Sequence, residues 1–569
     1  MRETKLTQIF FVFLLTLAVF YPVSKFDFIN FDDPTYVTEN SQVLAGLTRE
    51  GALWAFTSEH GAHWHPLAWI SHMVDIELFG KDPGAHHLVS VFIHALNSVF
   101  LLLLLNLLFS SSPANLLIAV VFAIHPLRIE SVVWISERKD VLSMFFSLAA
   151  LITYVSYAKR RSIVSYLLVV AFLFLSLLSK PSAIILPILF LLLDYYPLNR
   201  IREISFVKLV IEKIPFLLAC LLCALMAIWA QGEGGGLKSL ADYPIDVRFD
   251  SICVGYLTYL AKFFAPLHLG IFYPFEVYQP GVGSAAFIGI LAISYLVWSK
   301  KSKYPSLLFG WLWFLISLVL VIGFVQIGGQ AYADRWSYLP HIGLLIGVIN
   351  FWNAACSESL KKYNSILAIL VTISLITWTR LQLPYWKNTE SLFLHTIEIS
   401  PRNFMAHTNL GHFYQSQEKY EEAAREYESA VAVAPQYPVP LTNLASVRAL
   451  QERYDESLEL LIKVLAMKPR DINALHNTGS VYYHKGQNLL ALIYWLRAYS
   501  VSREAKPSKD SIYSLLEQLA TRGCSMLETS NSKTLFTELR DFHNRWPFPT
   551  DTPMRLGIEA ALKCQDSSD

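Results

Sequence analysis

This sequence has few charged residues. Charged residues make up 16% of its 569 residues, against roughly 25% in soluble domains. The 46 basic and 45 acidic side chains nearly cancel, which leaves a net charge of +1. This balance disfavours nucleic acid as the main partner, and a hydrophobic content of 54% excludes an intrinsically disordered chain. The apolar excess predicts a polytopic membrane protein.

Cysteine is also rare, and the six cysteines show no spacing typical of a metal site. Cys220 and Cys223 form a CxxC within an apolar run. Two packed thiols on one helix are a better interpretation there than a redox pair. The sequence predicts no disulfide framework.

Long runs without charge predict membrane-spanning helices, because the backbone must satisfy its own hydrogen bonds in lipid. The first run, Leu6–Ser24, is followed by no small-residue cleavage site, so we expect an anchor and not a removed signal peptide. The further runs are 88–110, 113–127, 141–158, 162–179, 181–193, 214–231, 281–299, 304–325, 338–357 and 363–379.

Basic residues in short connections predict the orientation. Four connections are basic, at 159–161, 200–213, 300–303 and 361–362. With these connections in the cytoplasm, about 11 spans cross the membrane in alternating directions, and the N-terminus is cytoplasmic. Segment 250–268 is apolar although both of its flanks fall outside, so we expect it to be re-entrant or interfacial. The aqueous segments are then 25–86, 128–140, 232–280, 326–337 and everything after about residue 380.

The C-terminal part repeats at the 34-residue interval typical of tetratricopeptide units. The recurring residues are Pro401, Pro435 and Pro469, then Asn409, Asn443 and Asn477, then Gly411, Ala445 and Gly479. We expect paired antiparallel helices in an α-solenoid, with capping helices from Lys509 onward. The predicted fold class is all-α, with a membrane domain at 1–385 and a repeat domain at 386–569.

The repeated asparagines have two interpretations. They fall on the first helix of each unit, where an amide can donate to and accept from an extended peptide. Alternatively, they bridge adjacent repeats.

An acidic pair, Asp32-Asp33, lies just after the first span. Paired carboxylates near hydrocarbon are costly unless they handle a cation or a proton. The alternative is an ordinary turn before Pro34. Later in the same loop, His63, His65 and the pair His86-His87 are either metal ligands or interfacial anchors.

A second charged segment covers 128–140. On a helix, Glu130, Glu137 and Arg138 could face one cavity. In 332–340, Arg335 could hold a phosphate with Tyr338 as a hydroxyl partner, or it could pair with Asp334. Lys180, at the outer end of a span, either snorkels to the surface or adds charge to the same cavity.

Taken together, these groups predict one outer-face cavity that receives a phosphate-bearing lipid. A carboxylate would deprotonate an acceptor hydroxyl, and cations would stabilise the leaving phosphate.

The order of these features resembles the transmembrane and tetratricopeptide repeat O-mannosyltransferases and their prokaryotic relatives, which have the C-type glycosyltransferase fold. The residues that carry the resemblance are Asn30-Phe31-Asp32-Asp33, Trp64-His65-Pro66-Leu67, Phe79-Gly80, His86-His87-Leu88, the run His125 to Asp140, Ala333-Asp334-Arg335 and Tyr338-Leu339-Pro340.

The resemblance implies transfer of a hexose, with mannose as the expected sugar, from a polyprenyl phosphate to Ser or Thr of extracytoplasmic proteins. It assigns the base to Asp33 or Asp32. It places Arg138 and Arg335 on the carrier phosphate. To the same phosphate we assign Lys139, His65, Lys180 and Tyr338, with Glu130 and Glu137 as supporting acids.

The acceptor protein is expected on the repeat groove at Asn409, Asn443 and Asn477. No cofactor is expected beyond the lipid-linked donor, and the sequence leaves open whether a divalent metal assists the reaction. The membrane is the cytoplasmic membrane in a prokaryote or the endoplasmic reticulum in a eukaryote.

Two other functions compete. A non-catalytic membrane scaffold would tolerate charge changes at Asp32, Asp33 and Arg138 but not in the repeat groove. A transporter or flippase would need ionisable residues near the bilayer midplane, whereas the predicted charges gather at one interface.

Overall fold

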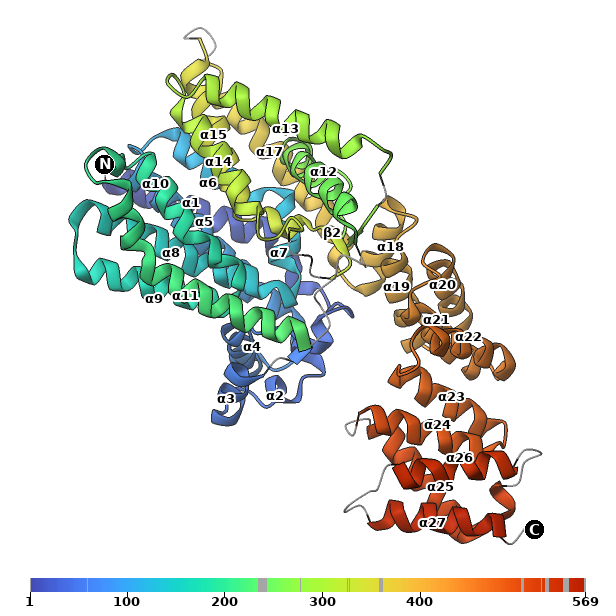
Figure 1. The fold of residues 1–569 in the computed structure, drawn as a ribbon. Helices are drawn as coiled ribbons and strands as arrows, with labels where there is room; N and C mark the ends of the chain where they lie inside the picture. The colour runs from blue at the N-terminus through green and yellow to red at the C-terminus, as the bar shows by residue number, and fades with distance from the viewer. Residues whose placement is uncertain are drawn as a thin grey trace. The chain divides into compact units, whose positions relative to one another are not determined.

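The computed structural model describes residues 2–58, 60–233, 243–276, 278–324, 326, 328–357, 362–502, 506–522, 524–527, 532–545 and 552–566. The chain forms two compact units, Met1–Pro401 and Arg402–Asp569. Both consist of helices, which confirms the predicted all-α class, and the ribbon in Figure 1 shows them.

The segment between the first two long helices is folded into short helices. After α1 (Arg2–Phe20), the chain forms η1 (Tyr21–Lys25), η2 (Pro34–Thr38), α2 (Ser41–Leu44), α3 (Arg49–Thr57), η3 (His60–Ala62) and α4 (Pro66–Phe79). Their core includes Tyr36, Trp69 and Met73 together with Ile135 from a later segment. The rings of Tyr36 and Trp69 stack with centroids 4.4 Å apart. Burial of these aromatic side chains therefore fixes the acidic pair against the 128–140 segment.

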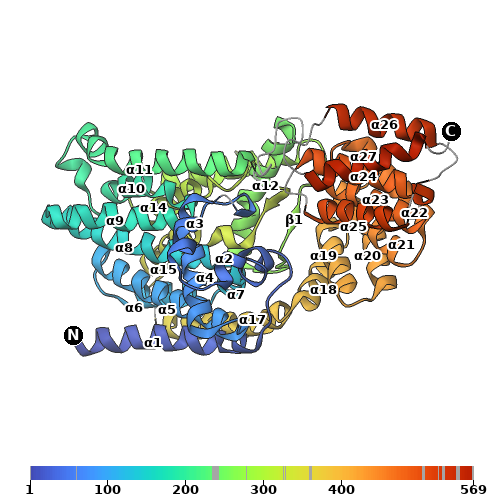
Figure 2. The same cartoon turned by 90° about the horizontal axis from the view of Figure 1, so that it is seen from below.

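The bundle proper is long and apolar. It comprises α5 (Pro83–Leu108), α6 (Pro113–Ile124), η4 (Pro126–Arg128), α7 (Ile129–Val133), η5 (Ile135–Glu137), α8 (Arg138–Arg160), α9 (Ile163–Ser179), η6 (Pro181–Ile185), α10 (Leu186–Tyr195), η7 (Arg200–Arg202) and α11 (Phe206–Glu233). In Figures 1 and 2, α8, α9 and α11 lie side by side.

The remainder of the first unit begins with α12 (Ile245–Phe264). It continues through β1 (Tyr273–Pro274), α13 (Val282–Ser299), α14 (Pro305–Leu318), β2 (Gln330–Tyr332), η8 (Asp334–Ser337), α15 (Pro340–Ala355), α17 (Asn364–Gln382), η9 (Leu383–Trp386) and α18 (Thr389–Ile399). The strands β1 and β2 pair antiparallel, which ties the 232–280 segment to the 326–337 segment.

Six helical stretches among the described residues are long and apolar enough to cross a membrane: Lys5–Lys25, Pro83–Leu108, Ile135–Arg160, Phe206–Ala230, Val282–Ser299 and Asn364–Trp386. A seventh would be the pair Pro113–Ile124 and Pro126–Val133, which bends by 56° at His125. Every predicted span contains a helix, but several are short, including Ile163–Ser179, Pro181–Tyr195 and Pro305–Leu318. The structure is thus compatible with a multi-pass membrane protein. The exceptional segment 250–268 forms most of α12, which is not among the candidate spans in the described residues.

The second unit begins with three helical hairpins, α19 (Phe404–Ser416) with α20 (Tyr420–Val433), α21 (Pro438–Leu450) with α22 (Tyr454–Met467), and α23 (Ile472–His484) with α24 (Asn488–Val501). A Cβ at Gly411 would lie 2.8 Å from the ring of Tyr427, and one at Gly479 would lie 2.5 Å from that of Trp495. Each recurring glycine therefore lets the two helices of a hairpin approach closely.

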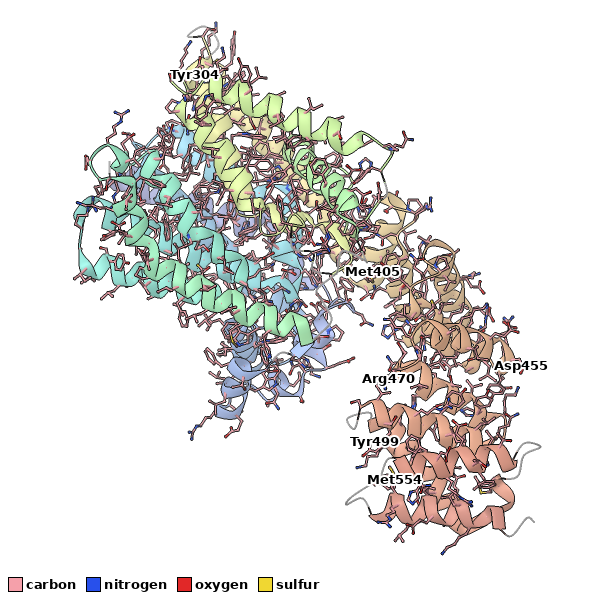
Figure 3. All side chains as sticks on the ribbon, in the orientation of Figure 1. Tyr304, Met405, Asp455, Arg470, Tyr499 and Met554 are labelled. Carbon is pink, nitrogen blue, oxygen red and sulfur yellow. The ribbon has the colours of Figure 1, made fainter. Side chains whose placement is uncertain are left out.

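The expected capping helices are α25 (Lys506–Arg522), η10 (Cys524–Leu527), α26 (Ser532–Arg545) and α27 (Thr552–Asp566). They share a core with α24 that contains Leu496, Leu516 and Met554, the last of which is labelled in Figure 3. Cys564 is disulfide-bonded, although the sequence predicts no disulfide framework.

The two compact units divide after Pro401. The reason is that the segment around α18 packs on the first unit. Lys387 O accepts a hydrogen bond from Asp27 N at 2.9 Å, and Thr389 Oγ1 accepts one from Asn30 N at 2.8 Å.

Candidate active site

Asp33 is fully buried, and both oxygens of its carboxylate accept hydrogen bonds. Oδ2 accepts a hydrogen bond from Ile29 N at 2.8 Å, and Oδ1 accepts bonds from Ser136 N at 3.0 Å and from Ser136 Oγ. Burial raises the pKa of Asp33 to about 6, although the hydrogen bonds from Ser136 and Ile29 lower it. Asp33 thus joins the 25–86 segment to the 128–140 segment.

Asp32 lies differently. It is half-buried, and its carboxylate accepts no hydrogen bond from the described part of the chain. Burial raises its pKa above 3.8, Lys139 and Arg335 lower it, and Glu137 raises it. Asp32 is therefore a carboxylate that faces a charged cluster and keeps its oxygens available.

Glu137 is the centre of that cluster. Its carboxylate lies 3.1 Å from Lys139 Nζ, 3.1 Å from Lys180 Nζ and 3.2 Å from Arg335 Nε. Lys180 Nζ also lies 2.5 Å from Asp140 Oδ1. One buried acid thus gathers three cations from separate segments, which supports the expectation of a charged cavity.

Arg335 is fixed by a second acid. Its Nη1 pairs with Glu130 Oε1, and its backbone N–H donates to Glu130 Oε2 at 2.7 Å. The nearby carboxylates of Glu130 and Glu137 raise the pKa of Arg335, against the effect of burial. Of its five guanidinium N–H groups, those on Nη2 have no partner among the described residues. Arg335 can therefore bind a further anion without leaving Glu130.

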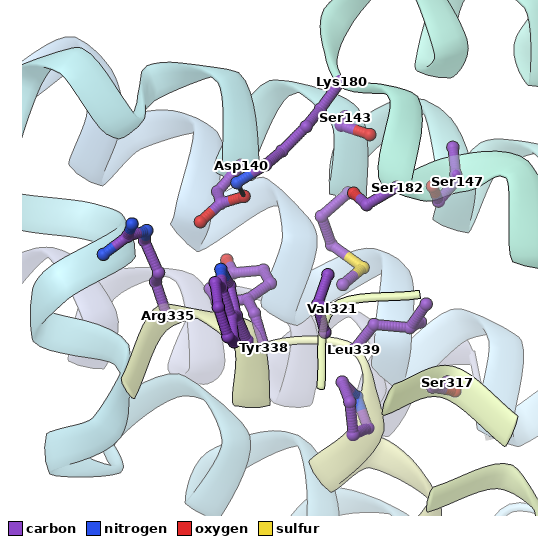
Figure 4. Close-up of a pocket in the computed structure, with 14 residues that line it drawn as sticks. Asp140, Ser143, Ser147, Lys180, Ser182, Ser317, Val321, Arg335, Tyr338 and Leu339 are labelled. Atoms are coloured by element: carbon purple, nitrogen blue, oxygen red, sulfur yellow. Dashed lines mark hydrogen bonds and ion pairs between the residues drawn. The ribbon is translucent and has the colours of Figure 1, made fainter. Parts of the chain in front are cut away.

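A pocket extends from this cluster into the bundle. Figure 4 shows Lys180 and Asp140 meeting on one side, with Arg335 across from them. Away from these charges the wall is mixed. Its apolar residues are Met144, Ala183, Val321, Leu339 and Pro340, and its hydroxyl groups belong to Ser143, Ser147, Ser182 and Ser317. The pocket therefore has a charged end beside a wall that is partly apolar.

The structure contradicts the expectation that Arg138 faces this pocket. The Arg138 side chain is fully buried elsewhere, where its guanidinium donates to Asp75 Oδ2, His86 O and Ser90 Oγ, each at 2.7 Å. Neighbours in the chain point apart here, since Lys139 joins the cluster and Arg138 does not.

Asp334 does not pair with Arg335 as one interpretation of the motif proposed. Its carboxylate accepts from Lys262 Nζ at 2.7 Å and from Tyr273 Oη at 2.6 Å. Lys262, which the sequence did not single out, thus anchors α12 and β1 to the 326–337 segment.

Tyr338 lines the pocket with its ring, but its hydroxyl lies 2.5 Å from His94 Nδ1 and accepts from Asn97 Nδ2 at 3.3 Å. That hydroxyl is therefore not the partner expected for a phosphate on Arg335. His94 and Asn97 were missed because they lie in an apolar run that reads as a membrane span.

His65 directly precedes α4 without a capping hydrogen bond from its side chain, and its ring stacks on that of His63 with centroids 5.1 Å apart. Burial lowers the pKa of His65 well below its ordinary value and lowers that of His63 to about 3. Both rings are neutral at physiological pH, so His65 can contribute a hydrogen bond to a phosphate but no charge.

The repeated asparagines do not act alike. Asn409 Nδ2 donates to Met405 O on its own helix at 2.8 Å. Asn443 donates to Tyr427 of the preceding repeat. Asn477 is half-buried with no hydrogen bond among the described residues. The bridging interpretation therefore holds for Asn443. The side-chain amide of Asn477 has donors and an acceptor available for a ligand.

Only one group in the described part of the chain has the spacing of a metal site. It consists of His72, Asp75 and His86 and includes neither member of the acidic pair. His72 and Asp75 were not selected from the sequence, where an i, i+3 pair on a helix is a weak signal.

Comparison with known proteins agrees with this architecture. A family model of the tetratricopeptide repeat matches residues 392–425. The chain is 23% identical over 76% of its length to mouse protein O-mannosyl-transferase TMTC3 and 22% identical over 67% to human TMTC1. It is 22% identical over 66% to the Caenorhabditis elegans protein O-mannosyl-transferase F38B6.6. It covers about half of these relatives, at 52%, 49% and 54% of their lengths. These similarities confirm the resemblance found in the sequence.

Proposed function

Because the chain is related to the transmembrane and tetratricopeptide repeat O-mannosyltransferases, we propose that it is a membrane glycosyltransferase. It moves a hexose, mannose by preference, from a polyprenyl phosphate to Ser or Thr hydroxyls of extracytoplasmic proteins. The observation that carries the proposal is the pocket of Figure 4, where Lys180 and Arg335 meet a partly apolar wall. Asp32, whose pKa is raised by burial and lowered by Lys139 and Arg335, supplies a carboxylate near this end.

The donor lies with its phosphate at Arg335 and Lys180. Arg335 offers its unused Nη2 donors, and Lys180 offers the third of its ammonium hydrogens, since two are directed to Glu137 and Asp140. Lys139 pairs with Glu137 and so offsets part of the negative charge of that carboxylate. The first isoprene units follow the wall formed by Met144, Ala183 and Val321.

Asp32 is the proposed base. Its oxygens are available, whereas those of Asp33 are held by Ser136 and Ile29. The acceptor oxygen attacks the anomeric carbon from the face opposite the phosphate, and its proton passes to Asp32. The bond between the anomeric carbon and the phosphate oxygen breaks, the configuration inverts, and Arg335 and Lys180 stabilise the charge on the leaving phosphate.

The proposed base, Lys139 and Arg335 come from segments predicted to lie outside, and Lys180 lies at the predicted outer end of a span. The disulfide at Cys564 supports placing the repeat unit outside as well, because disulfides persist in oxidising compartments. The acceptor protein binds the repeats, with Asn477 as the first amide to examine.

A transfer assay tests the proposal. Purified full-length protein in liposomes receives polyprenyl-phosphate mannose and a Ser/Thr-rich acceptor, and mass spectrometry detects hexosylated product. We expect product with the wild type and at least a 100-fold loss with Arg335→Gln. A protein that transfers no hexose from any polyprenyl phosphate, or an Arg335→Gln variant with full activity, would contradict it.

A further inference from the structure

A buried group of metal-binding side chains lies where the 25–86 segment meets the bundle. His72 and Asp75 are three residues apart on α4 and so share one face. His86 lies in the first turns of α5. All three side chains are buried, and one ligand atom from each lies within 4.8 Å of the other two.

The turn between the helices fixes which nitrogen of His86 is available. Gly80, at φ +62°, ends α4 and places its carbonyl 3.0 Å from His86 Nε2. A carbonyl only accepts, so Nε2 carries the hydrogen and the lone pair of neutral His86 is on Nδ1. This Nδ1 lies 3.4 Å from Asp75 Oδ2, another acceptor. Two acceptors at this distance call for a positive ion that both can bind.

His72 adds an independent observation. It is fully buried, and neither ring nitrogen has a hydrogen-bond partner among the described residues. A buried nitrogen without a partner costs roughly 1–3 kcal/mol. Protonation of His86 would satisfy the contact with Asp75 but would leave both nitrogens of His72 unpaired. A metal ion would use one of them.

Arg138 supplies the surroundings expected of a metal ligand. Its guanidinium donates to Asp75 Oδ2 at 2.7 Å and to the backbone carbonyl of His86 at 2.7 Å. Residues that ligate metals are commonly held in this way by a surrounding shell of hydrogen bonds. Asp75 Oδ1 has no partner among the described residues and is free to bind the ion.

We propose that His72, Asp75 and His86 bind one divalent first-row transition metal ion, with Zn²⁺ as the best fit. Two imidazoles and a carboxylate suit this class of ion. Ligand atoms around tetrahedral zinc are roughly 3.4 Å apart, close to the separation of His86 Nδ1 and Asp75 Oδ2. The ion joins α4 to α5 and is structural, so the proposal does not depend on the transferase function.

Metal content tests the site. Full-length protein in detergent is loaded with Zn²⁺, dialysed against a weak chelator and analysed by inductively coupled plasma mass spectrometry. We expect about one equivalent in the wild type and a loss of most of it in His72→Gln and His86→Gln. The matched control is His87→Gln, because His87 is also a buried histidine with an unpartnered nitrogen but lies outside the group. It should keep the metal.

X-ray absorption on the wild type provides a test that needs no variant. A nitrogen and oxygen shell at about 2.0–2.1 Å with the signature of two imidazoles supports the site. A wild type that retains no transition metal, a sulfur shell, or His72 and His86 variants that bind as much as His87→Gln would overturn the proposal.

Discussion

At the scale of the residue, the two adjacent aspartates differ in their hydrogen bonds. Asp33 is held by Ser136 and Ile29, whereas Asp32 faces the cations with its oxygens available. The sequence predicts the pair but cannot distinguish its members, because the difference depends on which carboxylate the backbone turns toward Ser136.

Asp32→Asn should therefore abolish catalysis without unfolding the protein. Loss of a general base costs about 100-fold to 10,000-fold in rate, and no hydrogen bond among the described residues is lost. Transfer assays and thermal unfolding measured in parallel check this. The matched control is Asp27→Asn, an exposed aspartate of the same loop. An Asp32→Asn enzyme with wild-type turnover would transfer the role of base to another group.

Asp33 should make stability depend on pH. Its pKa rises from 3.8 to about 6 on folding, so the folded state binds the proton more tightly than the unfolded chain. The resulting stabilisation is fully present below pH 3.8 and is lost as the pH rises through about 6. It amounts to at most about 3 kcal/mol.

The wild-type unfolding temperature should then fall, relative to that of Asp33→Asn, as the pH rises across this window. Differential scanning fluorimetry in detergent at matched ionic strength measures the difference between the two proteins. Curves that stay parallel throughout would show that Asp33 has an ordinary pKa.

At the scale of the element, the charge-free runs predicted the helices well. A segment that crosses lipid must satisfy its own backbone hydrogen bonds, and a helix does so. The pairing of charges was less predictable. Asp334 pairs with Lys262 and not with Arg335, and Arg138 pairs with Asp75. These partners come from distant segments, and a sequence pattern carries no information about which face of the bundle each segment meets.

The pocket beside α8 predicts a dependence on lipid length. Val321→Trp would fill the apolar end of the pocket, so the KM for a long polyprenyl donor should rise about 10-fold or more, by analogy with the 1–3 kcal/mol cost of overpacking. A mannosyl phosphate donor that lacks the isoprene chain should be affected little. Kinetics with both donors measure the contrast. Val319→Trp, at an exposed position outside the pocket, is the control. Equal effects on both donors would place the lipid elsewhere.

At the scale of the whole molecule, two units with different chemistry are joined in one chain. The repeat period predicted the paired helices of the second unit, and the recurring Gly411 and Gly479 lie where the two helices of a hairpin approach closely. The α18 helix, whose sequence resembles part of a repeat, packs on the first unit.

This organisation predicts separable defects. Gly479→Leu forces a side chain into Trp495 and should loosen the repeat unit. We expect transfer to a folded protein acceptor to fall about 10-fold, while transfer to a short peptide stays near wild type, because the peptide reaches the first unit alone. Paired assays with the two acceptors measure this, with Ser480→Ala as the neighbouring control. Equal losses with both acceptors would mean that the repeats do not select protein substrates.

The most direct test of the central claim is a cryo-electron microscopy structure of the full chain with polyprenyl-phosphate mannose bound. The account predicts the phosphate in contact with Arg335 and Lys180, the isoprene chain along Met144, Ala183 and Val321, and the anomeric carbon facing Asp32. A donor bound at another surface, or a sugar whose anomeric carbon lies out of reach of a hydroxyl held by Asp32, would contradict it.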